Sequence, residues 1–309
     1  MSAVRPSAGA WDLEAAAADA ARRRPTGGGG GFLRELLGQT LDPSDLANRD
    51  PEFIRRVAPI LYWVGKHYFR GEGEGMENIP ATGPFIAVGN HSGGPILPDV
   101  WVMGAWWAME VGVERPVYLM VHDTPFRVPV LNNFLMKVGA LRASRANAEK
   151  ALSSGAGLLV YPGGELDCLR SFRHRNTIDL QGRTGFIELA FTYGVPILPF
   201  VCIGGHEVYF TLFSSRRLAR WTGIERLTRV KTVPLIFGLP WGVWWTGFVP
   251  YLPLPSKLVY RTAKPIPFER NPDAAKDTVT VRRVYREVVD IMQGMMNDLA
   301  RRRRFPVIG

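Results

Sequence analysis

The chain has 309 residues, which is enough to bury a sizeable core and fits one catalytic domain with appendages. Lysine and arginine exceed aspartate and glutamate by ten, a balance that favours anionic partners such as nucleic acid, anionic lipid or phosphorylated small molecules. Two cysteines, Cys168 and Cys202, exclude a disulfide framework and a paired-cysteine zinc site, and they suggest a reducing compartment.

The amino-terminal part is expected to hold a tail followed by a helix. Residues 1–45 contain a long glycine run and interspersed charges, so we expect a flexible tail and no secretory signal. From residue 50 to 70, apolar residues recur at spacings of three and four, which predicts an amphipathic helix that packs on the domain or lies on a membrane. The apolar stripe comprises Phe53, Ile54, Val57, Ile60, Leu61, Val64 and Tyr68.

Short apolar runs bounded by glycine and proline predict buried strands at 83–90, 116–121, 157–162 and 195–203. Helices are predicted between them at 100–111, 126–137, 146–153 and 185–193. A late strand at 257–266 precedes a helix whose predicted apolar stripe is Val281, Val284, Val288, Ile291, Met295 and Leu299. This alternation predicts an α/β fold with a mixed, largely parallel central sheet flanked by helices, in which ligand sites gather at the carboxyl ends of strands.

The uncharged segment between Lys231 and Lys257 is long enough to cross a bilayer, but its prolines argue against a straight spanning helix. Its aromatic group favours a membrane-interface segment at 232–255, with a buried aromatic core as the alternative. That group is Trp241, Trp244, Trp245, Phe248 and Tyr251.

The segment "VGNHSGGPILPDV" places His91 at the carboxyl end of a buried strand, next to Asn90. An imidazole there faces a cleft and is able to take a proton from a hydroxyl near neutral pH. The glycines permit a turn, so Asp99 is able to point back at His91 and fix its tautomer. The alternative is that His91 only binds the loop backbone.

Two further segments carry charge near predicted helix starts. In "VGALRASRANAEKAL", Arg142 and Arg145 suit a phosphate, or they form a solvated face. In "GLLVYPGGELDCLRSFRHR", the glycines can present amides to an oxyanion, and the arginines at 170, 173 and 175 are able to bind phosphate beside it. A tight turn that carries a charged surface loop is the alternative.

These three segments, in this order, resemble the phospholipid/glycerol acyltransferase superfamily, the PlsC-like lysophospholipid acyltransferases. Its members carry an Asn-His-…-Asp motif, a Gly-…-Arg motif and a Pro-Glu-Gly or Pro-Gly-Gly motif. The resemblance covers residues 83–200, including "GVPILPF" as a fourth block, and the late strand. Seven residues between His91 and Asp99, and "PGGEL" in place of Pro-Glu-Gly-Thr-Arg, resemble the diacylglycerol acyltransferase-like branch.

The resemblance implies an acyltransferase domain over 46–309, with His91 as the catalytic base and Asp99 as its partner. It implies a phosphate contact for Arg145 and an acceptor site at Gly163, Gly164 and Glu165. The expected substrate-binding residues are completed by Asn90, Ser92, Gly93, Arg142, Arg170 and Arg173.

The implied reaction transfers a fatty acyl group from acyl-CoA, or from acyl carrier protein, to a glycerolipid hydroxyl. The expected acceptor is a lysophospholipid such as lysophosphatidate, or a mono- or diacylglycerol. Acyl-CoA is a co-substrate, and no other cofactor, metal or nucleic acid is expected. The expected location is the cytoplasmic face of a membrane.

Three alternatives remain open at this point. A thioesterase or serine hydrolase is suggested by Ser92 beside His91, although no Gly-x-Ser-x-Gly elbow occurs. A non-catalytic lipid-binding protein of the same fold is the second. Nucleic-acid binding is the third, and it rests on net charge alone, without a recognised motif.

Overall fold

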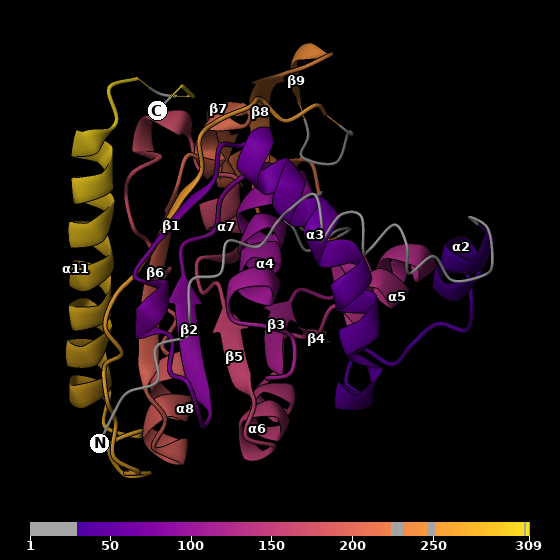
Figure 1. Ribbon diagram of the computed structural model, residues 1–309. Helices are drawn as coiled ribbons and strands as arrows, with labels where there is room; N and C mark the ends of the chain where they lie inside the picture. Colours follow the sequence, from indigo (N-terminus) through magenta and orange to yellow (C-terminus); the bar gives the residue numbers. More distant parts are fainter. Residues whose placement is uncertain (1–29, 224–225, 227–230, 246–250, 306, 309) are drawn as a thin grey trace.

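A computed structural model of the protein describes residues 30–223, 226, 231–245, 251–305, 307 and 308. Its centre is a seven-stranded sheet of order β1-β10-β6-β2-β5-β3-β4 (Figure 1). All neighbouring pairs in it are parallel except β10 with β6. The strands are β1 (Glu72–Glu74), β2 (Phe85–Gly89), β3 (Val117–Val121), β4 (Ala140–Arg142), β5 (Gly157–Val160), β6 (Ile197–Ile203) and β10 (Val259–Thr262). The predicted mixed, largely parallel sheet is confirmed.

Helices cover both faces of this sheet, so its central strands β2 and β6 are buried and apolar along their whole length, as inner parallel strands are. One face packs on α4 (Pro98–Glu110), which α3 (Pro51–His67) covers in turn. The other face packs on α6 (Arg145–Ser153), α8 (Gly185–Tyr193) and α11 (Thr278–Arg302). The remaining α-helices are α2 (Gly30–Leu36), α5 (Pro129–Lys137), α7 (Gly164–Cys168) and α9 (Arg216–Trp221).

A second, smaller sheet is inserted between β6 and β10. It has the order β7-β8-β9 and is antiparallel, with β7 (Phe210–Ser215), β8 (Val233–Gly238) and β9 (Gly242–Trp245). Single 3₁₀ turns lie at Leu46–Asn48, Met76–Asn78, Gly94–Ile96, Thr124–Arg127, Phe172–His174 and Gly205–Glu207. In the part of the chain that the structure describes, no helix combines the length and the apolar character needed to cross a membrane.

The predicted amphipathic helix at 50–70 corresponds to α3, but its inward face differs from the predicted stripe. Asp50 caps the helix by accepting the Phe53 N–H, and Pro51 opens it. Phe53 and Ile54 are buried, whereas Ile60 and its neighbour Trp63 are more than half exposed. The inward positions further along are small or polar-tipped residues, Ala58, Tyr62 and Gly65, which an apolar-spacing argument passes over.

Two other predictions need comment. In α11 the core side chains are Met292 and Met296, and the predicted Ile291 and Met295 lie at the border of the stripe, half-buried. Of the predicted flexible tail, 1–45, residues 1–29 lie outside the described residues. Its residues 30–36 form α2, which buries Leu36.

Candidate active site

His91 lies directly after β2, at the carboxyl end of the main sheet. The last residue of β2, Gly89, has no room for a side chain, since a Cβ there would lie 2.1 Å from the Phe200 ring. Asn90 is buried and bonds both ways with Cys202 of β6, donating to its carbonyl at 3.0 Å and accepting its N–H at 2.8 Å. Asn90 was expected to bind substrate. Its side-chain amide instead forms the hydrogen bonds that attach the His91 loop to β6.

Asp99 reaches His91 because the chain between them turns back on itself. Gly93, Gly94 and Leu97 all have positive φ, and a 3₁₀ turn lies between them before α4 begins at Pro98. The turn sets the Asp99 Oδ2 atom 3.0 Å from His91 Nδ1 and lets it accept the Ser92 N–H at 2.7 Å. The seven intervening residues thus still produce the predicted contact between the two side chains.

The pair differs in exposure, since the Asp99 side chain is completely buried and that of His91 is 14% exposed. Burial opposes the charged imidazolium, but the carboxylates of Asp99, Asp167 and Glu165, with Asp99 contributing most, together outweigh it and raise the pKa of His91 above its ordinary value of 6.5. The carboxylate also holds the proton on Nδ1, which leaves the Nε2 lone pair able to accept a proton. The Tyr161 ring lies against the imidazole, with centroids 4.8 Å apart.

Asp167 is a residue of this site that the sequence analysis did not assign. Its buried carboxylate accepts the backbone N–H of His91 at 2.7 Å and pairs with Arg170 at 2.9 Å. Burial raises its pKa to about 6, against the lowering effect of Arg170. His206 lies 4.0 Å away, and burial with the positive charge of Arg170 lowers its pKa to about 3, so His206 is neutral near pH 7.

The Pro-Gly-Gly turn lies beside Asp167 but is packed differently from the expectation. A Cβ at Gly163 would meet the Asp167 side chain at 2.4 Å, and one at Gly164 would meet Arg183 at 2.7 Å. Arg183 donates to the Pro162 carbonyl at 2.8 Å. The Gly164 amide donates to Tyr161 within the turn, so it is already engaged and is not positioned as an oxyanion donor.

Most of the arginines expected to bind phosphate are engaged with protein groups. Arg142 pairs with Asp123 at 3.2 Å, two strands beyond β5 at the edge of the sheet. Arg145 pairs with two carboxylates, at 2.9 and 3.0 Å. Arg170 is largely buried; it pairs with Asp167 and donates to the carbonyls of residues 177 and 179. Arg173 is exposed. Glu165 is partly buried, 4.0 Å from Arg183.

Ser92 does not have the geometry of a nucleophile. Its side chain is fully buried, and among the described residues its hydroxyl finds no hydrogen-bond partner. The hydroxyl packs so closely on Gly205 that a Cβ there would lie 2.0 Å from it. The neighbouring Gly93 carbonyl accepts the Tyr251 hydroxyl at 2.5 Å. The structure therefore gives no support to a serine hydrolase built on Ser92.

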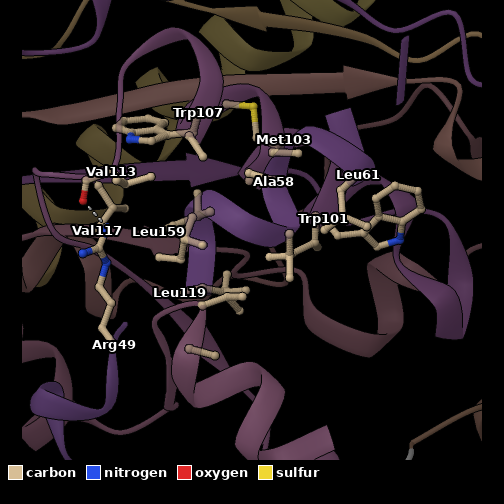
Figure 2. Close-up of a pocket in the computed structure, with 18 of the residues that line it drawn as sticks. Arg49, Ala58, Leu61, Trp101, Met103, Trp107, Val113, Val117, Leu119 and Leu159 are labelled. Atoms are coloured by element: carbon tan, nitrogen blue, oxygen red, sulfur yellow. Dashed lines mark hydrogen bonds between the residues drawn. The ribbon is translucent and has the colours of Figure 1, made fainter. Parts of the chain in front are cut away.

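An apolar cavity of about 170 Å³ lies between α3, α4, α5 and the sheet (Figure 2). Its wall begins at Val100 and Trp101, the two residues that follow Asp99, and continues to Met103 on α4. Leu61 of α3 and Leu159 of β5 close opposite sides. The space is suited to a hydrocarbon chain because its lining is apolar apart from Arg49 and Arg115.

Comparisons with known proteins identify the family. The family model for acyltransferases matches residues 71–203. An uncharacterized protein of Mycobacterium tuberculosis is 31% identical over 265 residues, which cover 85% of this chain and 70% of that protein. Human diacylglycerol O-acyltransferase 2 is 33% identical over 213 residues, 66% of this chain and 54% of that protein.

The solved structure of the 1-acyl-sn-glycerophosphate acyltransferase PlsC from Thermotoga maritima superposes with a TM-score of 0.51 and 18% identity, over 90% of both chains. At that identity the likeness shows the fold. The family model and the relatives show that the chain belongs to the acyltransferase family, and within it the chain is similar to diacylglycerol O-acyltransferase 2.

Proposed function

We propose that this acyltransferase moves a fatty acyl group from acyl-CoA to the hydroxyl of a glycerolipid, with His91 as general base. The observation that carries the proposal is the His91–Asp99 pair at the carboxyl end of β2, beside an apolar cavity. An acyl carrier protein thioester is an equivalent donor in chemical terms. We further propose that the enzyme works at the cytoplasmic face of a membrane, where such acceptors reside.

In the proposed reaction, Asp99 holds the Nδ1 proton and the free Nε2 atom of His91 takes the proton of the acceptor hydroxyl. The acceptor oxygen forms a bond to the thioester carbonyl carbon. The tetrahedral intermediate then expels the thiolate as the carbon–sulfur bond breaks, and the imidazolium returns its proton to that sulfur. The products are an ester and a free thiol.

The cavity supports an acyl chain as the transferred group, although about 170 Å³ of apolar space holds only part of a long one. Val100 and Trp101, the two residues that follow Asp99, belong to its wall, and in this proposal the carboxyl end of the chain points toward the His91 turn. Trp101, Met103 and Leu159 supply apolar contacts along its length, and burial of each methylene contributes about 0.8 kcal/mol.

The ion pairs of the arginines favour a neutral acceptor, a mono- or diacylglycerol, over lysophosphatidate. Arg142 and Arg145 are each occupied by carboxylates, and Arg170 is buried away from solvent. Arg142 and Arg145 are about half exposed, so a phosphate would compete with these carboxylates for the two guanidinium groups. The name of the human relative, diacylglycerol O-acyltransferase 2, agrees with a neutral glyceride.

The test is thiol release from a long-chain acyl-CoA by the purified protein, with lysophospholipids, monoacylglycerol and diacylglycerol as acceptors. General base catalysis contributes about 10²–10⁴-fold, so His91→Ala should lower acceptor-dependent release by at least about 10²-fold. His122→Ala is the matched control, since His122 is exposed and bonds only its own loop at Thr124.

Other outcomes separate the alternatives. Thiol release that needs no acceptor would identify a thioesterase. Lipid binding without turnover in both wild type and His91→Ala would identify a non-catalytic lipid-binding protein. Loss of activity in Ser92→Ala, with normal folding, would revive the serine mechanism, whereas the buried hydroxyl predicts retained activity.

A further inference from the structure

The small sheet β7-β8-β9 is apolar on both faces. One face packs on the core, whereas among the described residues the other is covered only in part, at Phe210, on which Phe172 packs with ring centroids 4.8 Å apart. The register pairs Ile236 with Trp244, and these side chains turn inward, where Ile236 is buried and Trp244 packs on the core. The alternate positions therefore turn outward. An antiparallel sheet with one covered face usually carries polar residues on the other.

The outward positions of this sheet are apolar on all three strands. Phe213 pairs with Leu235, which pairs with Trp245, so these three form one cross-strand row. Phe237 and Val243 form a second pair on the same side. We call these five residues the outer face; except for the half-buried Leu235, they are 41–57% exposed. A contiguous exposed patch of this kind marks an interaction site.

The segment that contains the outer face is rich in basic residues. Residues 208–255 contain six lysines and arginines and one acidic residue, Glu225, so this insertion carries a charge of +5. Directly after β7, the helix α9 exposes Arg216 and Arg217, and its Trp221 is 84% exposed. Exposed tryptophan and arginine together suit the boundary between water and an anionic bilayer, where the rings enter the headgroup region and the cations contact phosphates.

The insertion is also tied to the active site. Tyr251, which follows the small sheet, donates to the carbonyl of Gly93 in the His91–Asp99 turn at 2.5 Å. Tyr209, just before β7, packs its ring on Tyr251, with centroids 4.9 Å apart. In Figure 1, β9 projects at the end of the molecule toward which β2 and β5 point, the end that carries His91. A bilayer bound at the outer face would therefore lie next to the turn that holds the base.

We propose that the outer face and α9 form a docking surface for an anionic lipid bilayer. The choice of a bilayer over an acidic protein rests on the proposed function, since a glycerolipid acceptor is delivered from a membrane. The docking itself is measurable without turnover.

The experiment uses the full chain and vesicles of phosphatidylcholine, with or without about one third phosphatidylglycerol. Binding is measured by co-sedimentation at low and high salt. Phe237→Ser, Val243→Ser and Trp245→Ser are combined in one variant. Its matched control replaces three residues of similar exposure in α2, directly after α2 and in α5: Leu33→Ser, Leu37→Ser and Leu131→Ser.

Wild type should bind the anionic vesicles, more weakly in high salt, and the outer-face variant should bind at least about tenfold more weakly. The control variant should bind as wild type does. A second readout places an environment-sensitive fluorophore on Val243→Cys, where labelling is selective because Cys168 and Cys202 are buried. Its emission should shift to the blue on adding vesicles, whereas the same label on the exposed Val279→Cys of α11 should not respond.

Loss of binding in the control variant only, or no vesicle binding by wild type, would overturn the proposal. A wild-type dimer that dissociates in the outer-face variant would assign the surface to a second copy of this chain. The proposed function is tested separately with substrate in detergent micelles: activity there without vesicle binding would reject the docking surface alone, and binding without activity would reject the reaction alone.

Discussion

Asp99 acts on His91 from a position that has no exposure to solvent. A buried carboxylate needs donors, and it receives them from the Ser92 amide and the imidazole. Its position depends on Leu97, a non-glycine residue held at φ +53° directly before α4. The backbone thus accepts an unfavourable conformation at the point where the carboxylate has to turn toward the base.

Replacing Asp99 by asparagine should lower kcat by about 10²–10⁴-fold, because the tautomer of His91 is no longer fixed and its imidazolium loses its counter-charge. The base works when neutral, so wild-type activity should rise with pH through a pKa above 6.5. Without the carboxylate that raises this pKa, the midpoint should move to lower pH. The measurement is the pH profile of kcat/KM, with the exposed Asp273→Asn as control.

Asp167 is expected to position His91 through its backbone amide. Asp167→Asn keeps an oxygen that can accept the His91 N–H, whereas Asp167→Ala removes it; both lose the ion pair with Arg170. Alanine should therefore reduce kcat more than asparagine does. Since the Asp167 charge also raises the pKa of His91, the pH midpoint of Asp167→Asn should move down. Equal kcat in the two variants and an unmoved midpoint would contradict this role.

The sequence located His91 and Asp99 but not Asp167, for a physical reason. The first two lie in one turn, where the strand end, glycines and helix start can all be recognised locally. Asp167 comes from a separate segment 76 residues further on, and it acts on a backbone amide, which leaves no side-chain pattern. The ion pairs of the arginines were not predicted for the same reason. Glu188, which pairs with Arg145, lies 43 residues away in the sequence.

At the level of whole elements, long apolar runs were predictable and short strands were not. The predicted strands correspond to β2, β3, β5, β6 and β10, because buried parallel strands consist of continuous apolar residues. Strands β1 and β4 have three residues each, too few to show a period. The predicted aromatic segment at 232–255 contains β8 and β9. These strands show no alternation of apolar and polar residues in the sequence, because both faces of their sheet are apolar. Phe248, which was assigned to this segment, lies outside the described residues.

Helix α4 offers a direct test of the cavity at Gly104. This residue lines the cavity at an exposed position, and a Cβ built on it meets no atom within 4 Å, so Gly104→Phe should place a ring at the opening of the cavity. Activity on long-chain acyl-CoA should fall relative to short-chain acyl-CoA, by about tenfold or more in the ratio of kcat/KM. The measurement is a series of donors of increasing chain length.

The control for this variant is Gly294→Phe in α11. Gly294 is also a mid-helix glycine with open space around its Cβ, but it lies away from the cavity. Both substitutions remove a helical glycine, a change that should raise stability by up to about 1 kcal/mol. An unchanged chain-length preference in Gly104→Phe would show that the acyl chain lies elsewhere.

On the scale of the whole molecule, the carboxyl-terminal segment closes the fold around Glu207. The buried Glu207 carboxylate accepts two bonds from Arg303, at 3.0 and 2.7 Å, and one from the Val307 amide at 2.8 Å. The Val307 carbonyl in turn accepts from Arg70, just beyond α3. Segments from the start, middle and end of the domain therefore meet at one carboxylate.

Arg303→Ala should lower the free energy of unfolding by about 1–3 kcal/mol, because it leaves a buried carboxylate with fewer partners. The loss stays below that of a wholly unpaired charge, since Ser256 and Arg175 remain near Glu207, at 3.2 and 3.5 Å. Urea unfolding measures the difference, and Arg301→Ala, on an exposed side chain of the same helix, should cost less than about 0.5 kcal/mol. Equal destabilisation by the two variants would mean that the carboxyl-terminal segment adds nothing beyond an ordinary surface ion pair, and that the domain is held by its sheet and helices alone.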